Sequence, residues 1–82
     1  MTYVYLLYDY EEHGPRRLRA TLDRSKVRDI ALAEWSNDFP KDLPVLEAGI
    51  DDALALPDEA LEEGQQFRDG WGWPGMQTVR LE

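Results

Sequence analysis

Residues 2–10, TYVYLLYDY, form the most strand-like stretch of this chain, and the rest of the fold can be worked out from it. Tyrosine and branched residues favour strands, and they dominate this stretch. Apolar side chains stand at both odd and even positions, whereas a strand with one wet face alternates apolar with polar residues. We therefore predict a strand that lies centrally in a sheet or is covered on both sides.

Residues 16–22 alternate cleanly and predict a second, half-buried strand. The apolar side holds Leu18, Ala20 and Leu22, and the polar side holds Arg17, Arg19 and Thr21. Residues 11–15, EEHGP, separate the two segments and are typical of a turn. The first two elements are therefore expected to form a hairpin.

A helix is expected after this hairpin. Asp23 or Ser25 can cap its start, because each offers a short side-chain acceptor to free backbone N–H groups. The apolar stripe of the helix holds Val27, Ile30, Ala31 and Trp35. Pro40 sets the end, since the residue before a proline disfavours helical backbone. Trp35 is predicted to lie in the core.

Residues 42–56 are harder to interpret, because their apolar positions hold no single period. We expect a short extended piece at 43–47 and a helical turn near 51–54. Pro57 suits a first helical position, and the acids that follow it suit the start of a helix dipole. A short helix is therefore expected from residue 57 to about residue 66, weakened by Gly64.

Residues 68–75 predict a glycine-rich loop, and residues 76–81 alternate again as a final strand beside the first. The 82 residues suffice for one domain, residues 1–82. The expected class is α+β: a small antiparallel sheet of about three strands in the order β-β-α-α-β, with helices packed on one face.

Composition narrows the classes of function. The chain has no cysteine, which excludes disulfides and thiolate zinc sites. Its net charge is −8, and the whole excess of acids lies in residues 42–82. Direct nucleic-acid binding needs cations against phosphates, so we expect none. No apolar window reaches the length of a membrane span or a signal peptide, so a leaderless cytoplasmic protein without membrane contact is expected.

Catalytic signals are lacking in the sequence. The single histidine, His13, lies in a charged turn, and no G-x-S-x-G elbow is present. The acidic clusters do not match the spaced ligands of a calcium loop. We therefore predict no enzyme activity, no catalytic residue, no metal and no cofactor.

The acidic half and the Trp-Gly-Trp loop predict the binding surface. Carboxylates without intervening bases suit a positively charged partner, in the way that small inhibitors mimic nucleic acid, although they also keep a small domain soluble. One tryptophan of the loop is expected to cap the core, and an exposed one is typical of an interface. The expected partner-binding residues are Asp51, Asp52, Asp58, Glu59, Glu62, Glu63, Trp71 and Trp73.

The function expected from these features is a non-enzymatic protein-binding domain of the kind that phages and mobile elements use as anti-defence inhibitors. Two alternatives stay open. Arg17 and Arg19 share a strand face and, with the loop of Trp71 and Trp73, could bind a nucleotide. Those arginines could equally protect an exposed strand face or pair with the acidic half of a second copy. The second alternative is a structural homo-oligomeric subunit whose open sheet edge pairs with another copy.

Overall fold

The computed structural model describes residues 2–9 and 17–81. These residues form a four-stranded antiparallel sheet in the order β2-β1-β4-β3. The strands are β1 (Thr2–Asp9), β2 (Leu18–Thr21), β3 (Gln65–Gln66) and β4 (Pro74–Leu81). The expected α+β class is confirmed, with four strands in place of about three.

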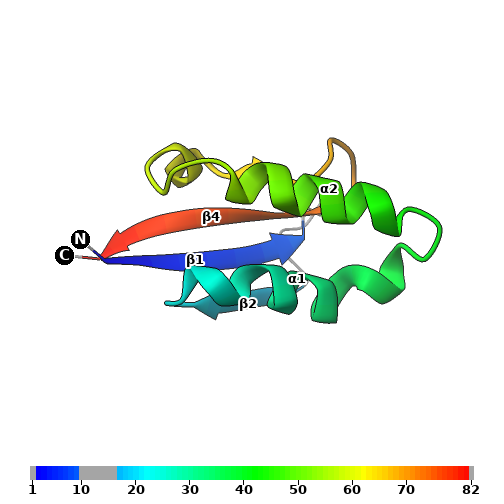
Figure 1. Ribbon diagram of the computed structural model, residues 1–82, viewed down its shortest axis with the longest axis horizontal. Coiled ribbons are helices and arrows are strands. Elements are labelled where there is room, and N and C mark those ends of the chain that lie inside the picture. The colour runs from blue at the N-terminus through cyan, green and yellow to red at the C-terminus, as the bar shows by residue number, and fades with distance from the viewer. Residues whose placement is uncertain (1, 10–16, 82) are drawn as a thin grey trace.

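Two α-helices, α1 (Val27–Trp35) and α2 (Leu43–Leu54), lie on the same side of the sheet (Figure 1). Short 3-10 turns connect the larger elements: η1 (Arg24–Lys26), η2 (Ser36–Asp38) and η3 (Ala60–Glu63). Asp23 caps η1 by accepting a hydrogen bond from the Ser25 N–H at 2.9 Å, as its position predicted. No helix of the described ranges is long and apolar enough to cross a membrane.

β1 occupies the centre of the sheet. It pairs with β2, where Tyr5 lies opposite Thr21, and along its whole length with β4, from Thr2 opposite Leu81 to Asp9 opposite Pro74. This confirms both the pairing of the first two strands and the place of the last strand beside the first. The expected turn at 11–15, with His13 in it, lies outside the described residues.

The core lies between the sheet and the two helices. Alternate side chains of β1, starting with Tyr3, point into it, and Trp35 is fully buried as predicted. Fully burying a large apolar side chain contributes roughly 1.5–3 kcal/mol, so the buried residues of the two helices together hold the helical layer on the sheet. The buried apolar set is Tyr3, Tyr5, Leu7, Val27, Ala31, Trp35, Leu46, Ile50, Ala53, Leu61, Phe67 and Met76.

The apolar side of β2 is not its buried side. Leu18 pairs with Tyr8 and Ala20 with Leu6, so both lie on the face opposite the helices, where both are exposed. Leu22, directly after β2, is also exposed. The expectation that apolar alternation marks the covered side was wrong here, because carboxylates of β1 and α1 hold Arg19 of β2, and Arg17 directly before it, on the helix side.

The extended piece expected at 43–47 is also corrected, because these residues begin α2. Leu46, Ile50 and Ala53 are buried and follow each other at helical spacing. Pro44 falls in the first helical turn, where its missing N–H has no helical partner to lose. Gly49 explains the interrupted pattern: a Cβ there would lie 2.2 Å from the Phe67 carbonyl oxygen, so the helix needs a glycine where an apolar side chain was sought.

No α-helix spans 57–66. The described chain forms only η3 in this region and then continues as β3. Gly64 separates the two with a φ of 88°, a left-handed backbone that glycine adopts without a steric penalty. Of the apolar residues expected to face inward from this segment, Leu61 and Phe67 reach the core, whereas Ala60 is exposed.

Candidate functional site

One face of the sheet, here called the open face, points away from both helices. The pairing registers assign it the strand residues Thr2, Val4, Leu6, Tyr8, Leu18, Ala20, Gln66, Gly75, Gln77, Val79 and Leu81. None of these residues is charged, in a chain in which 32% of the residues are. Leu18 is 54% exposed, Leu81 44% and Val79 39%.

The charged residues of the strands all lie on the other, covered face. Asp9, Arg19 and Arg80 stand at positions that alternate with the open face. An antiparallel sheet with one covered face ordinarily places apolar groups inward and polar groups toward water. The reversed distribution of charge makes the open face the most unusual surface among the described residues.

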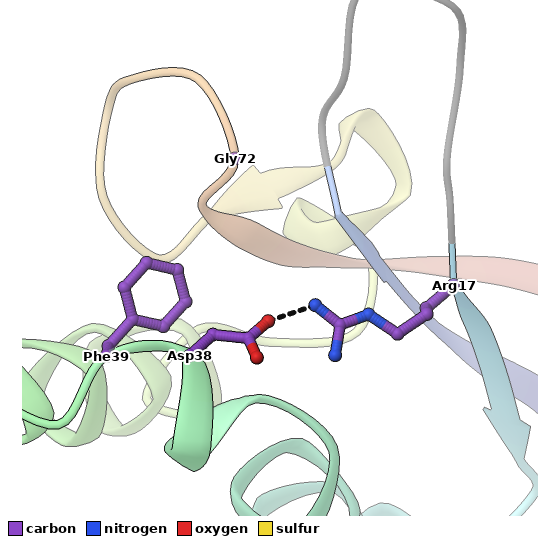
Figure 2. Close-up of a pocket in the computed structure, with 4 residues that line it drawn as sticks. All are labelled: Arg17, Asp38, Phe39 and Gly72. Carbon is purple, nitrogen blue, oxygen red and sulfur yellow. Dashed lines mark hydrogen bonds and ion pairs between the residues drawn. The ribbon is translucent and has the colours of Figure 1, made fainter.

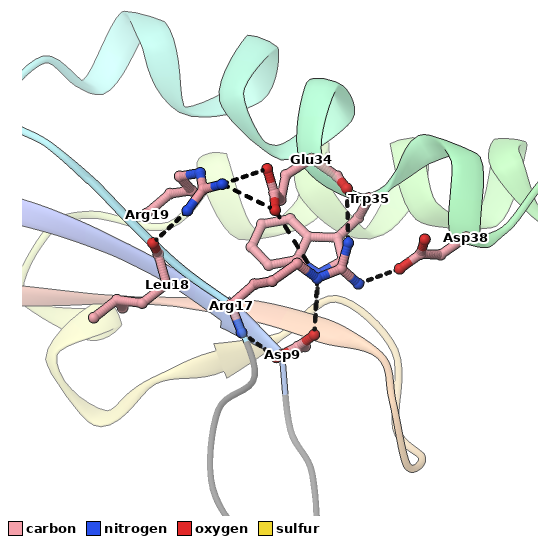
Figure 3. Close-up of polar contacts among 7 residues, drawn as sticks. All are labelled: Asp9, Arg17, Leu18, Arg19, Glu34, Trp35 and Asp38. Atoms are coloured by element: carbon pink, nitrogen blue, oxygen red, sulfur yellow. Dashed lines mark hydrogen bonds and ion pairs between the residues drawn. The ribbon is translucent and has the colours of Figure 1, made fainter.

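Asp9 anchors a polar cluster on the covered face (Figure 3). Its side chain is fully buried and accepts hydrogen bonds from the Arg17 N–H at 3.1 Å, from Arg17 Nε at 3.3 Å and from Trp35 Nε1 at 3.4 Å. The Arg17 guanidinium also donates to the Glu34 carbonyl oxygen at 3.0 Å and pairs with Asp38. The cluster therefore joins the end of β1 to the end of α1.

The arginines proposed as ligand-binding groups are both engaged in this cluster. Asp38, followed by Asp9, raises the pKa of the Arg17 guanidinium above its ordinary value by hydrogen bonding and charge, although burial opposes the shift. Arg19 pairs with Glu34 at 3.1 Å. Three carboxylates thus surround two guanidinium groups, a balance that disfavours the phosphate of a nucleotide.

An open pocket of about 690 Å³ adjoins this cluster and is lined by Arg17, Asp38, Phe39 and Gly72 (Figure 2). Arg17 and Gly72 of the Trp-Gly-Trp loop thus line the same pocket, which is the arrangement that the nucleotide-binding alternative requires. The four lining residues supply one ion pair and one aromatic ring, and the positive charge of Arg17 is already balanced by Asp38. We assign no ligand to this pocket.

The two tryptophans of the loop have different environments. Trp73 stacks on Phe39 with ring centroids 4.1 Å apart, carries the Arg68 guanidinium 5.3 Å from its ring centroid, and packs against the core. Trp71 is 76% exposed. One indole therefore caps the core and the other faces solvent, in agreement with the sequence-based prediction.

The predicted acidic surface divides into two groups. Three of its carboxylates are paired: Asp51 with Arg28 at 3.0 Å, Asp58 with Arg24, and Glu62 with Arg80 at 3.0 Å. The other three, Asp52, Glu59 and Glu63, are exposed and make no ion pair within the described part of the chain. Only this second group presents fully available charge to a partner.

Asp58 belongs to a structural cluster at the other end of the sheet. It accepts hydrogen bonds from the Tyr5 hydroxyl at 3.0 and 3.1 Å and pairs with Arg24. Arg24 Nη2 also donates to the carbonyl oxygens of Leu54 and Leu56, both at 2.6 Å. A cation at the end of α2 suits the helix dipole, so this cluster fixes α2 to the sheet.

Raising the pH is expected to weaken the fold through Tyr5. Burial, and then the hydrogen bond and charge of Asp58, raise the pKa of Tyr5 above its ordinary value, although Arg24 opposes them. The folded protein thus keeps this proton to higher pH than the unfolded chain, whose tyrosines titrate near about pH 10. The stabilisation is complete below that pH and is lost as the pH rises through the folded-state value.

Urea unfolding at about pH 8 and about pH 11 measures this effect, and Tyr5→Phe should lose less stability between the two than the wild type. Tyr8→Phe is the matched control, because it removes one phenol from the open face. An equal loss in Tyr5→Phe and the wild type would contradict the role given to Tyr5.

Sequence reasoning did not identify the open face, although its signal was present. Residues 2–10 carry apolar side chains at both odd and even positions. The last strand carries Val79 and Leu81 on the side away from Met76. The sequence does not show that both helices pack on the same side of the sheet, which leaves the other side uncovered by them. Within residues 2–9 and 17–81, no three histidine or acidic side chains gather closely enough to hold a metal ion.

Comparison with known proteins provides no relative for this chain: no protein-family model matches it, and neither does any curated protein or any solved structure. Its function is therefore inferred from its own residues.

Proposed function

We propose that this chain is a non-enzymatic protein-binding domain that binds its partner through the open face. The observation that carries the proposal is that all three charged strand residues lie on the covered side while the open side has none. Contiguous exposed apolar patches on small proteins commonly mark interaction sites. Covering Leu18, Val79 or Leu81 with a partner would contribute about 1 kcal/mol each, since each is roughly half exposed.

Substitution of Val79 by lysine tests this proposal. The tagged wild type, Val79→Lys and the control Ala33→Lys are used to capture proteins from the native host, and the captured protein is then purified for direct titration. Ala33 is exposed on α1, so the control adds the same charge on the helix side. We expect Val79→Lys to weaken binding at least about tenfold, because the lysine ammonium must be desolvated against an apolar surface.

The control variant should bind as the wild type does. Equal binding by all three proteins would rule out the open face as the contact surface. Circular dichroism of each variant establishes that it is folded, so a loss of binding can be attributed to the surface rather than to unfolding.

A second candidate function is an acidic inhibitor of a basic or nucleic-acid-binding protein, of the phage or mobile-element type. The exposed, unpaired carboxylates Asp52, Glu59 and Glu63 and the 76% exposure of Trp71 favour it. The same capture at two salt concentrations separates the candidates. Binding through carboxylates falls with ionic strength, whereas binding through the apolar open face persists.

A further inference from the structure

We infer that the partner on the open face is a second copy of this chain, which packs its own open face against the first. The inference rests on the function proposed above and names the partner. Figure 1 shows both helices on one side of the sheet, so two copies joined in this way would carry their helices on the outside. The arrangement uses the face of the sheet and leaves its edges unpaired.

Charge is the first argument for a second copy. Each chain carries a net charge of −8, so two copies that meet through acidic surfaces repel each other. The open face is the large strand surface that brings no charged side chain to the contact. A basic partner gains nothing there, because the face offers it no carboxylate. An uncharged apolar surface suits a partner surface of the same character, and a second copy supplies one.

Geometry is the second argument. A two-fold dimer places the same patch on both sides of the contact, so the patch must complement itself. Two twisted sheets satisfy this condition when they pack face to face about 10 Å apart with strands nearly aligned, as in a β-sandwich. The open face has the required form, with apolar side chains on the neighbouring strands β2, β1 and β4.

The size of the face indicates how strong such a dimer would be. β1 and β4 each have 8 residues, which at about 3.3 Å per residue gives a length of roughly 26 Å. Three strands about 4.8 Å apart give a footprint of roughly 300–400 Å² per copy, so the dimer would bury roughly 600–800 Å² in total. This is below the roughly 1,200–2,000 Å² of a standard specific interface, so we expect a weak dimer with a dissociation constant on the order of 0.1–1 mM.

Sedimentation equilibrium of the purified chain, across concentrations that span this range, is the test. We expect a monomer–dimer equilibrium that strengthens when salt is raised, because salt screens the repulsion between two acidic copies and does not weaken apolar contact. Leu18→Lys and Val79→Lys should each weaken dimerisation at least about tenfold, and Ala33→Lys should leave it unchanged or strengthen it.

Three results would overturn the second copy as partner: a monomer at every concentration and salt, association that weakens with salt, or association unaffected by either open-face lysine. The salt series needs no variant, so the test survives if a variant fails to fold. A monomeric chain whose capture of another protein still depends on Val79 would refute the dimer and leave the proposed function standing. A chain that stays monomeric, and whose capture of a partner does not depend on Val79, would refute both the dimer and the proposed function.

Discussion

Replacing Asp9 with alanine is expected to lower the free energy of unfolding by about 3 kcal/mol. The Asp9 carboxylate is fully buried and is hydrogen bonded to Arg17 and to Trp35 Nε1. Its loss leaves the indole N–H without its acceptor and the guanidinium without its buried counter-charge. Arg17 keeps 26% side-chain exposure and its contact with Asp38, which places the cost at the lower end of the range for broken buried pairs.

Urea unfolding of the wild type, Asp9→Ala and the control Asp38→Ala measures this cost. Asp38 also pairs with Arg17 but is 37% exposed, so its removal should cost less than about 1 kcal/mol. For an 82-residue domain, about 3 kcal/mol corresponds to a fall in Tm of roughly 12–24 °C. Equal losses in the two variants would mean that burial does not distinguish Asp9 from Asp38.

Gly49→Ala is expected to destabilise the protein by about 2–3 kcal/mol, the cost typical of overpacking. Alanine favours a helix interior over glycine by roughly 0.5–1 kcal/mol, so helix propensity alone predicts the opposite sign. The steric effect wins because the new Cβ would lie 2.2 Å from the Phe67 carbonyl oxygen, 2.8 Å from its carbonyl carbon and 2.9 Å from its Cβ. Two of these atoms belong to the backbone, so α2 must move away from the segment that leads out of β3.

Ala48→Gly is the matched control for Gly49→Ala. Ala48 is exposed on the same helix, so this change reports the helix propensity of α2 without a steric contact. It should cost about 0.5–1 kcal/mol in thermal or urea unfolding. A Gly49→Ala variant as stable as the wild type would show that α2 can move without loss of packing.

Sequence reasoning worked where one residue type dictates a local structure. Trp35 at helical spacing and the strand character of residues 2–10 identified the core helix and the central strand correctly. It failed where a contact between distant segments decides the outcome. The sequence shows no reason for the glycine at position 49 of α2, because only the folded chain brings Phe67 into the space that a side chain there would need. The residues 57–66 form η3 and β3 because Gly64 turns the chain toward β4.

The candidate sites divide in the same way. The composition is sufficient to show that the chain is acidic and has no cysteine, because net charge and cysteine content do not depend on how the chain folds. Which carboxylates remain available depends on pairing: Asp58 and Glu62 are used by Arg24 and Arg80, whereas Glu63 is not.

The local pattern was sufficient to establish that β2 has an apolar and a polar side, because side chains alternate along any strand. The tertiary structure was needed to show which side the helices cover. Asp9 and Glu34 hold Arg17 and Arg19 beneath α1, and these ion pairs leave Leu18 and Ala20 on the open face. Pairing with the buried Asp9 and with Glu34, which only the folded chain brings beside β2, thus accompanies the reversal of the usual placement, and the apolar side of β2 becomes part of the surface through which we propose binding.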